Sequence, residues 1–203
     1  MNSNLETVIF IGNSGAGKGE QVKLLKKYIA EKDAEKGIFY LETGSLFREF
    51  FAGTGYTHDL AQKIYEKGGR QPGFLAIHMW SHALINLMKE DQHLLIDGTP
   101  RSLKEAKIFD TAMNFYQRKK SFVVYINVTR QWSKEHLLAR GREDDTEEQV
   151  EKRLDWFDED VVPAIEYFKS NPDYRFIDVN GEQTIPEVNT EMMAKMREQG
   201  FTL

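Results

Sequence analysis

The chain has 203 residues, of which 40% are hydrophobic and 29% charged, with no cysteine and a net charge of −5. This length suits one compact domain. The negative charge argues against a nucleic-acid-binding protein that relies on phosphate contacts, and the lack of cysteine excludes disulfides, thiolate nucleophiles and cysteine-ligated zinc. With neither a signal-peptide pattern nor an apolar stretch of membrane-spanning length, we expect a soluble, cytoplasmic protein that does not bind membranes.

The first predicted strand, Val8–Ile11, runs into the glycine-rich stretch GNSGAGKGEQ, residues 12–21. Its glycines and Lys18 match the spacing G-x-x-x-x-G-K-[ST] of a phosphate-binding loop, except that Gly19 stands in place of the hydroxyl residue. Between a strand and a helix, such a loop wraps backbone N–H groups around phosphates. The stretch by itself therefore predicts only that some phosphate is bound, and the alternative is a glycine turn beside a surface lysine.

Four more apolar runs predict buried strands at residues 38–41, 94–96, 122–128 and 176–179. Segments with helical periodicity separate them, as at residues 22–29. Strands that alternate with helices predict a parallel sheet covered on both faces. We expect an α/β fold with a central five-stranded parallel sheet flanked by helices. Two segments interrupt the alternation: helical pieces near 43–89, and a charged break at 140–145 before a helix from about 146 to 170.

The third predicted strand ends in a carboxylate, Asp97, which would lie at the carboxyl edge of the sheet. A carboxylate there suits Mg²⁺ held through water. Further along, Arg140, Arg142 and Arg153 surround the charged break. Single arginines are mostly solvated surface groups, but phosphoryl transfer between two polyanions needs several cations at one centre. The combination points to phosphoryl transfer.

In order along the chain, these segments resemble adenylate kinase, the nucleoside monophosphate kinase family with a P-loop NTPase fold. The loop at 12–21 resembles that family's G-x-x-G-x-G-K-G-T-Q, in which glycine follows the lysine. The other matching segments are LETGSLFR (41–48, like S-T-G-D-x-L-R), DGTPR (97–101, like D-G-F-P-R), REDD (142–145) with Arg153 (like R-x-D-D…K-R-L), and VNGEQ (179–183, like V-x-G).

The resemblance implies one domain with a core (1–42, 90–139, 146–203), a monophosphate-binding insert (43–89) and a short, zinc-free lid (140–145). It implies a monomer that catalyses ATP + AMP = 2 ADP with Mg²⁺. The implied ATP-binding residues are Gly12, Gly15, Ala16, Gly17, Lys18, Gly19, Glu20, His136, Arg140 and Gln183. The implied monophosphate-binding residues are Thr43, Gly44, Arg48, Arg70, Gln71, Gly98, Arg101, Glu105, Arg142 and Arg153. The implied catalytic residues are Lys18, Arg101, Arg140, Arg142 and Arg153, with Asp97 for Mg²⁺.

One departure bears on the choice of acceptor. Glu105 stands where adenylate kinases carry a glutamine that pairs with the AMP base. A carboxylate only accepts hydrogen bonds, so it would face the lone pair of adenine N1 at a cost of about 1–3 kcal/mol. Guanine, with N1–H and a 2-amino group, matches it better, unless Glu105 turns into solvent. Thr43 favours AMP, because the related UMP/CMP kinases generally have alanine there. AMP is the expected acceptor, and GMP or another monophosphate is the alternative.

Three further departures lie near the expected ATP and Mg²⁺ positions. Glu20 replaces a threonine, Ser45 an aspartate, and His136 an arginine that stacks on the ATP adenine. Together they suggest slower turnover or altered nucleotide choice. They also motivate a third hypothesis, a nucleotide-binding sensor without catalysis.

Overall fold

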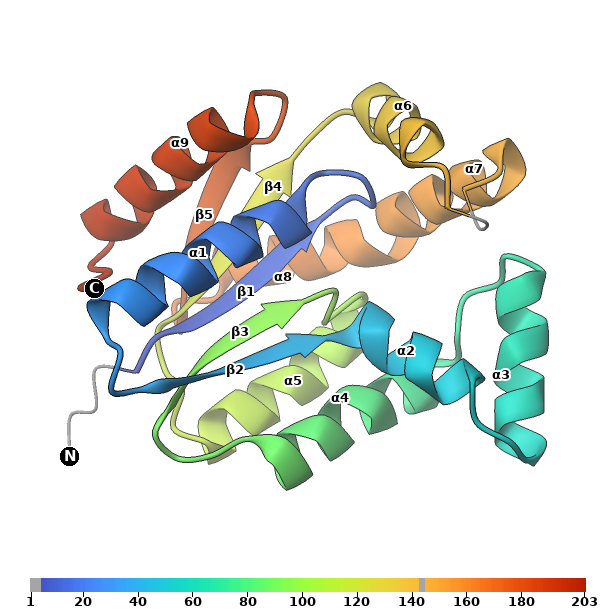
Figure 1. Ribbon diagram of the computed structural model, residues 1–203, viewed down its shortest axis with the longest axis horizontal. Helices are drawn as coiled ribbons and strands as arrows, with labels where there is room; N and C mark the ends of the chain where they lie inside the picture. The colour runs from blue at the N-terminus through green and yellow to red at the C-terminus, as the bar shows by residue number, and fades with distance from the viewer. Residues whose placement is uncertain (1–4, 143–144) are drawn as a thin grey trace.

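The computed structural model describes residues 5–142 and 145–203 of the chain. Its centre is a five-stranded parallel sheet in the order β2-β3-β1-β4-β5, which confirms the predicted fold class (Figure 1). The strands are β1 (Thr7–Gly12), β2 (Gly37–Glu42), β3 (Gln92–Asp97), β4 (Ser121–Asn127) and β5 (Tyr174–Asn180).

The first strand, β1, lies at the centre of the sheet, between β3 and β4. Its register places Phe10 beside Asp97 on one side and Val124 on the other. After β1 the chain builds one side of the sheet with β2 and β3, and then the other with β4 and β5. Ligands of open parallel sheets bind at the carboxyl ends of the strands where the order reverses in this way. The glycine-rich loop follows β1 and therefore stands at that position.

Both faces of the sheet are covered. Helices α1 (Lys18–Lys32) and α9 (Ile185–Glu198) pack on one face, and α4 (Gly73–Leu87), α5 (Leu103–Phe115) and α8 (Val162–Ser170) on the other. Side chains of β1 alternate between these layers, with Val8 and Phe10 in the first and Ile9 and Ile11 in the second. A strand covered on both sides needs an unbroken apolar run, which explains the run in the sequence.

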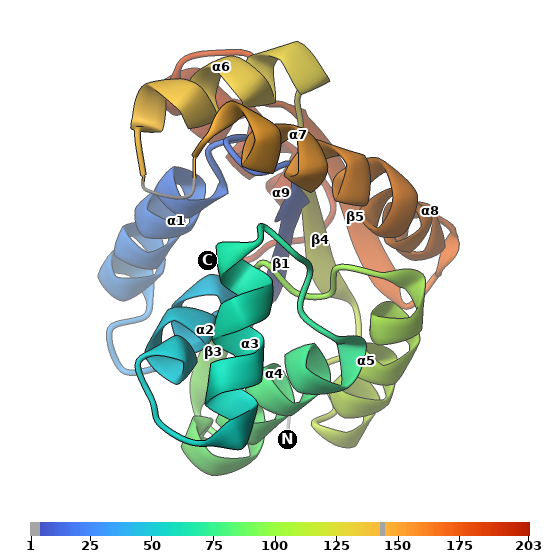
Figure 2. The same ribbon diagram turned by 90° about the vertical axis from the view of Figure 1, so that its right-hand side faces the viewer.

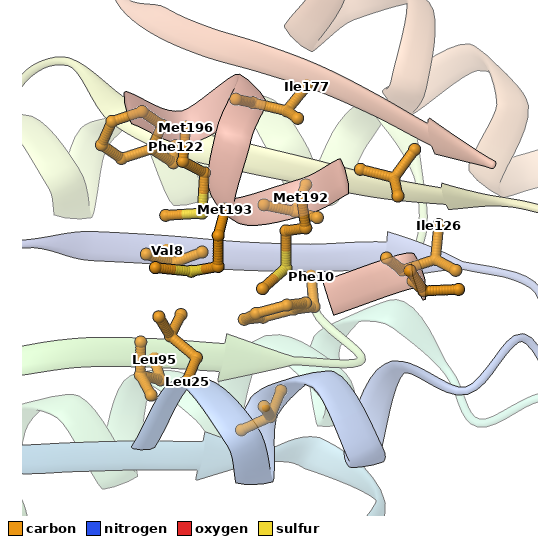
Figure 3. Close-up of a cluster of buried hydrophobic side chains, with 14 of the residues drawn as sticks. Val8, Phe10, Leu25, Leu95, Phe122, Ile126, Ile177, Met192, Met193 and Met196 are labelled. Atoms are coloured by element: carbon orange, nitrogen blue, oxygen red, sulfur yellow. The ribbon is translucent and has the colours of Figure 1, made fainter. Parts of the chain in front are cut away.

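The layer under α9 is rich in methionine. Met192, Met193 and Met196 pack against Val8 and Phe122 in one buried cluster (Figure 3). Unbranched methionine side chains adapt to irregular gaps between a helix and a twisted sheet. These methionines are therefore part of the core.

The remaining helices lie beyond the carboxyl ends of the strands. Figure 2 shows α2 (Thr43–Phe51) and α3 (Tyr56–Glu66) on one side and α6 (Arg130–Arg140) and α7 (Glu147–Trp156) on the other. The helix expected from about 146 to 170 is helical throughout its length, but it contains a π-helical segment, η1 (Phe157–Val161), between α7 and α8. A π segment inside a helix often marks a functional region.

At the start of β3, the fold buries a histidine completely. His93 Nδ1 accepts a hydrogen bond from the N–H of Glu6 at 3.0 Å, and its Nε2 lies 3.1 Å from Asp33 Oδ2. Because Nδ1 is the acceptor, Nε2 carries the proton. Burial lowers the pKa of His93, although Asp33 opposes the effect.

This arrangement predicts acid sensitivity. The unfolded chain binds the histidine proton more readily than the folded chain, so the contribution of His93 to stability is complete above pH ~6.5 and decreases as the pH falls below that value. We expect His93→Gln to reduce the loss of unfolding free energy between pH 7.5 and 5.5, as measured by urea denaturation. Equal losses in the two proteins would contradict the prediction.

Candidate active site

The glycine-rich loop joins the carboxyl end of β1 to α1. A Cβ on Gly12, whose φ is 156°, would lie 2.6 Å from the carbonyl oxygen of Ile126 in β4, so glycine is required there. Gly17 has φ 84° immediately before α1, and a Cβ there would meet nothing within 4 Å. Gly15 packs close to α6 and Ala16 is buried, whereas Gly19 and Glu20 are exposed. The loop thus offers an exposed helix N-terminus, which suits an anion.

Lys18 folds back over this loop. Its Nζ donates to the carbonyl oxygens of Gly12 at 2.9 Å and Asn13 at 2.8 Å. Burial lowers the pKa of the Lys18 ammonium; Asp97 opposes this, and Arg101 and Arg140 reinforce it. Charged groups from two other segments, 97–101 and α6, therefore act on the Lys18 ammonium at the carboxyl edge of the sheet.

Asp97 ends β3, next to β1, and is only 9% exposed. Burial raises the pKa of its carboxyl, whereas Lys18 and Arg101 act to lower it. The hydroxyl of Tyr40, from β2, belongs to the same environment, because burial and the nearby carboxylates of Asp97 and Glu42 raise its pKa as well. A carboxylate at this edge is a suitable oxygen ligand for Mg²⁺ or its water.

The segment after Asp97 turns back on itself. Arg101 Nε donates to the carbonyl oxygen of Gly98 at 2.6 Å, and the Arg101 side chain is exposed. Glu105 accepts hydrogen bonds from the Thr99 hydroxyl at 3.0 Å and the Arg101 N–H at 2.8 Å. Only 4% of Glu105 is exposed. The alternative that Glu105 turns into solvent is therefore wrong.

At the end of β2, the chain enters α2 directly. Arg48 in α2 forms an ion pair with Glu42 at 2.9 Å. The Arg48 guanidinium passes close to Gly44, because a Cβ added at Gly44 would lie 3.2 Å from Arg48 Nη1. Thr43 is 2% exposed, and its hydroxyl has no hydrogen-bond partner in the described part of the chain. A buried hydroxyl of this kind is available to a ligand.

The loop between α3 and α4 contacts distant segments. Arg70 pairs with Asp160 of η1 and also donates to the carbonyl oxygen of Arg101 at 3.2 Å. Gln71 instead turns towards α3, where its Nε2 donates to the carbonyl oxygen of Ala61 at 2.8 Å. The two neighbours, both expected at the monophosphate, thus have different partners in this structure.

Asp145 accepts hydrogen bonds from all three arginines expected at the lid. Its fully buried carboxylate accepts two hydrogen bonds from Arg140, at 2.9 and 2.8 Å, and one from Arg153 at 2.8 Å. The backbone N–H of Arg142 adds a fourth at 3.2 Å. Burial alone would raise the pKa of Asp145, but these hydrogen bonds lower it to about 2. Glu143 and Asp144, the other acidic residues of the expected lid motif, lie outside the described residues.

The two residues expected at the ATP base have protein partners. His136 stacks on Trp132, with ring centroids 4.2 Å apart and planes 21° from parallel. Gln183 donates to the carbonyl oxygen of Asn180 at 2.8 Å and to Glu191 at 2.6 Å. Near Gln183 lies a cavity of about 440 Å³, lined by Asn127, Val128, Thr129, Asp178, Asn180, Glu182, Glu191 and Lys195.

The sequence matches known proteins of one family. The family described as adenylate kinase matches residues 10–172. The chain is 31% identical over 189 residues to an adenylate kinase of Corynebacterium aurimucosum, covering 93% of this chain and 97% of that protein. It is 26% identical to one of Prochlorococcus marinus strain MIT 9301, with the same coverage, and 28% identical to one of Flavobacterium psychrophilum, covering 91% of this chain and 95% of that protein.

The chain belongs to the adenylate kinase family. The protein is therefore a phosphotransferase of the nucleoside monophosphate kinase class, and the resemblance drawn from its motifs is confirmed. Across residues 5–142 and 145–203, no helix has the length and apolar character to span a membrane. The same residues contain no group of three or more His, Cys, Asp or Glu side chains arranged to hold a metal ion.

Two residues of this adenylate kinase family member gained their importance only from the structure. Asp145 stood in the acidic motif but had no assigned partner, although arginines nearby in the chain are good partners for a carboxylate. Asp160 carried no signal, because nothing in the sequence links it to Arg70. Of the departures from the family, Glu20 is exposed and Ser45 lies 3.5 Å from Glu49.

Proposed function

We propose that this protein transfers the terminal phosphoryl group of Mg·ATP to a nucleoside monophosphate, with AMP as the preferred acceptor and two ADP as products. The observation that carries the proposal is that the charges of Asp97, Arg101 and Arg140 all act on the Lys18 ammonium. Cations from separate segments around one point suit a transferring phosphoryl group, whose charge is spread over three oxygens.

The donor half of the proposed site is the glycine-rich loop. In the free protein, Lys18 Nζ donates to the carbonyl oxygens of Gly12 and Asn13. When ATP binds, its phosphate oxygens would replace these carbonyl oxygens as the acceptors for Nζ. Asp97 fits a magnesium ion because it is a buried carboxylate at the same edge. When bound, Mg²⁺ would neutralise charge between the outer phosphates. Backbone groups near Gln183 and the ring of His136 are proposed to bind the adenine.

The acceptor half is proposed to lie on the insert formed by residues 43–89. Arg48 and Arg101 would bind the monophosphate, and the hydroxyl of Thr43, which has no hydrogen-bond partner among residues 5–142 and 145–203, would face the base. Arg48 is exposed and forms an ion pair with Glu42 at the surface, and such pairs contribute little to stability, about 0–1 kcal/mol. A dianionic phosphate can therefore compete for this guanidinium.

Residues 140–145 are proposed as a short lid. Closure is a property carried over from the family; its physical purpose is to exclude water, which would otherwise accept the phosphoryl group. Asp145 holds Arg140 and Arg153 together, so the two guanidiniums would move over the transferring group as one unit. Arg142 would join them from the same segment.

The test is a panel of initial rates of ADP formation from Mg·ATP with AMP, GMP, CMP, UMP and dTMP. We expect AMP to react fastest. Removing the metal with EDTA should abolish most of the activity, and added Mg²⁺ should restore it. Asp97→Asn should weaken the response to Mg²⁺, because a neutral amide binds Mg²⁺ and its water less strongly. ATP binding without ADP formation from any acceptor would reject the proposal in favour of a nucleotide sensor, and a preference for GMP would correct the acceptor.

A further inference from the structure

Both oxygens of the Glu105 carboxylate accept hydrogen bonds from other residues of the protein. One oxygen accepts from the Thr99 hydroxyl and the other from the Arg101 N–H, so each oxygen has a donor from the segment that follows Asp97. The residue also lies in the first turn of α5, where its own N–H donates to Oγ of the N-cap residue, Ser102. Three hydrogen bonds therefore tie Glu105 to residues 99–102.

Hydrogen bonds fix the backbone of Arg101 on both sides. Its N–H is held by Glu105 at 2.8 Å, and its carbonyl oxygen accepts from Arg70 at 3.2 Å. Its side chain is held at the guanidinium, because Nε donates to the carbonyl oxygen of Gly98. With both backbone polar atoms and Nε held, the exposed end of the Arg101 guanidinium points in a restricted direction.

We infer that Glu105 is a positioning residue that orients Arg101 for the acceptor phosphate and does not read the acceptor base through its charge. This inference rests on the proposed function. An ionised carboxylate is an acceptor only, and here both oxygens are turned to internal donors in a site that is 4% exposed. Each oxygen keeps a second lone pair, but a base could reach it only by entering a place in which Glu105 is 4% exposed.

The chemistry of the side chain separates the two roles. In Glu105→Gln, the amide oxygen can accept from the Arg101 N–H while the amide nitrogen donates to Thr99, because a hydroxyl both donates and accepts. The loop contacts survive with one bond reversed. In Glu105→Ala, both donors lose their partner in a buried place, which is costly. If Glu105 instead read the base, Glu105→Gln should change the order of acceptors, since Gln and Glu present different hydrogen-bonding patterns to adenine and guanine.

The experiment measures kcat and KM for each monophosphate, and separately for ATP, in the wild type, Glu105→Gln, Glu105→Ala and Thr99→Val. We expect Glu105→Ala to lower acceptor kcat/KM about tenfold or more, the loss of hydrogen bonds to a charged group, with KM for ATP unchanged. Glu105→Gln should recover most of this loss and keep the order of acceptors. Thr99→Val, which removes one of the two donors, should have an intermediate effect.

A second measurement needs no turnover. Hydrogen exchange at the Arg101 amide, followed by NMR in the free protein, should be slow in the wild type and Glu105→Gln and faster in Glu105→Ala. Glu35→Ala is the matched control, because Glu35 is exposed in the turn between α1 and β2; it should leave rates and exchange unchanged.

The outcomes distinguish the inference from the function. A wild type inactive with every acceptor rejects the proposed function. An active wild type with Glu105→Gln reversing the order of acceptors overturns the positioning role and makes Glu105 the base reader. Unchanged acceptor kcat/KM or unchanged Arg101 exchange in Glu105→Ala also overturns it.

Discussion

Replacing Lys18 with methionine is expected to lower the rate of ADP formation by about 10²–10³-fold, the typical cost of removing one preorganised group that stabilises transition-state charge. Methionine keeps much of the apolar stem, so the packing around the loop should persist. Only the ammonium, which donates to the carbonyl oxygens of Gly12 and Asn13 in the free protein, is lost. The measurement is the initial rate with saturating Mg·ATP and AMP, together with circular dichroism to confirm the fold.

Lys27→Met is the matched control for this substitution. Lys27 lies on the same helix, is mostly exposed and pairs with the likewise exposed helix residue Glu31 at 4.0 Å. It should change neither the rate nor the affinity for ATP. A Lys18→Met protein that retains the wild-type rate would show that the loop does not take part in transfer.

Asp145→Asn is expected to lower turnover by about 10²-fold, because small displacements of catalytic groups have effects of that size. The neutral amide cannot hold Arg140 and Arg153 together as the ionised carboxylate does. The loss should appear mainly in kcat, since the expected role of these arginines is in the transfer step. Unchanged kcat would contradict the role proposed for this cluster.

The same substitution should reduce stability in a pH-dependent way. The folded protein lowers the pKa of Asp145 to about 2 from its ordinary value of 3.8, so the group stabilises the fold above pH ~4, and this contribution disappears as the pH falls towards 2. The partly exposed arginines are screened by solvent, which leaves about 1–2 kcal/mol at pH 7. Urea denaturation should show this difference between wild type and Asp145→Asn at pH 7, and a smaller one at pH 3.

Asp155→Asn provides the comparison for the stability experiment. Asp155 also pairs with an arginine, Arg130, but its side chain is 57% exposed. Exposed pairs contribute little, so its loss should change the unfolding free energy by less than about 1 kcal/mol at either pH. Equal effects of the two substitutions would mean that the burial of Asp145 has no energetic importance.

The sequence by itself determined the fold class, the phosphate-binding loop and the strand that ends at Asp97. These features are local: buried strands of a parallel sheet require apolar runs, and the loop requires glycine at fixed spacings from a lysine. The order of the motifs was enough to find the family. It was not enough to find the partners of the charged residues.

Those partners were decided by tertiary packing. Glu105 could have faced a base or solvent, and only the turn of residues 98–101 placed both of its oxygens on internal donors. Arg70 meets Asp160 because the loop before α4 lies against η1, ninety positions away in the chain. Asp145 is shared by Arg140 and Arg153 because α6 and α7 converge. A carboxylate can satisfy its charge in many ways, and which way it does depends on the donors that the fold brings within about 3 Å.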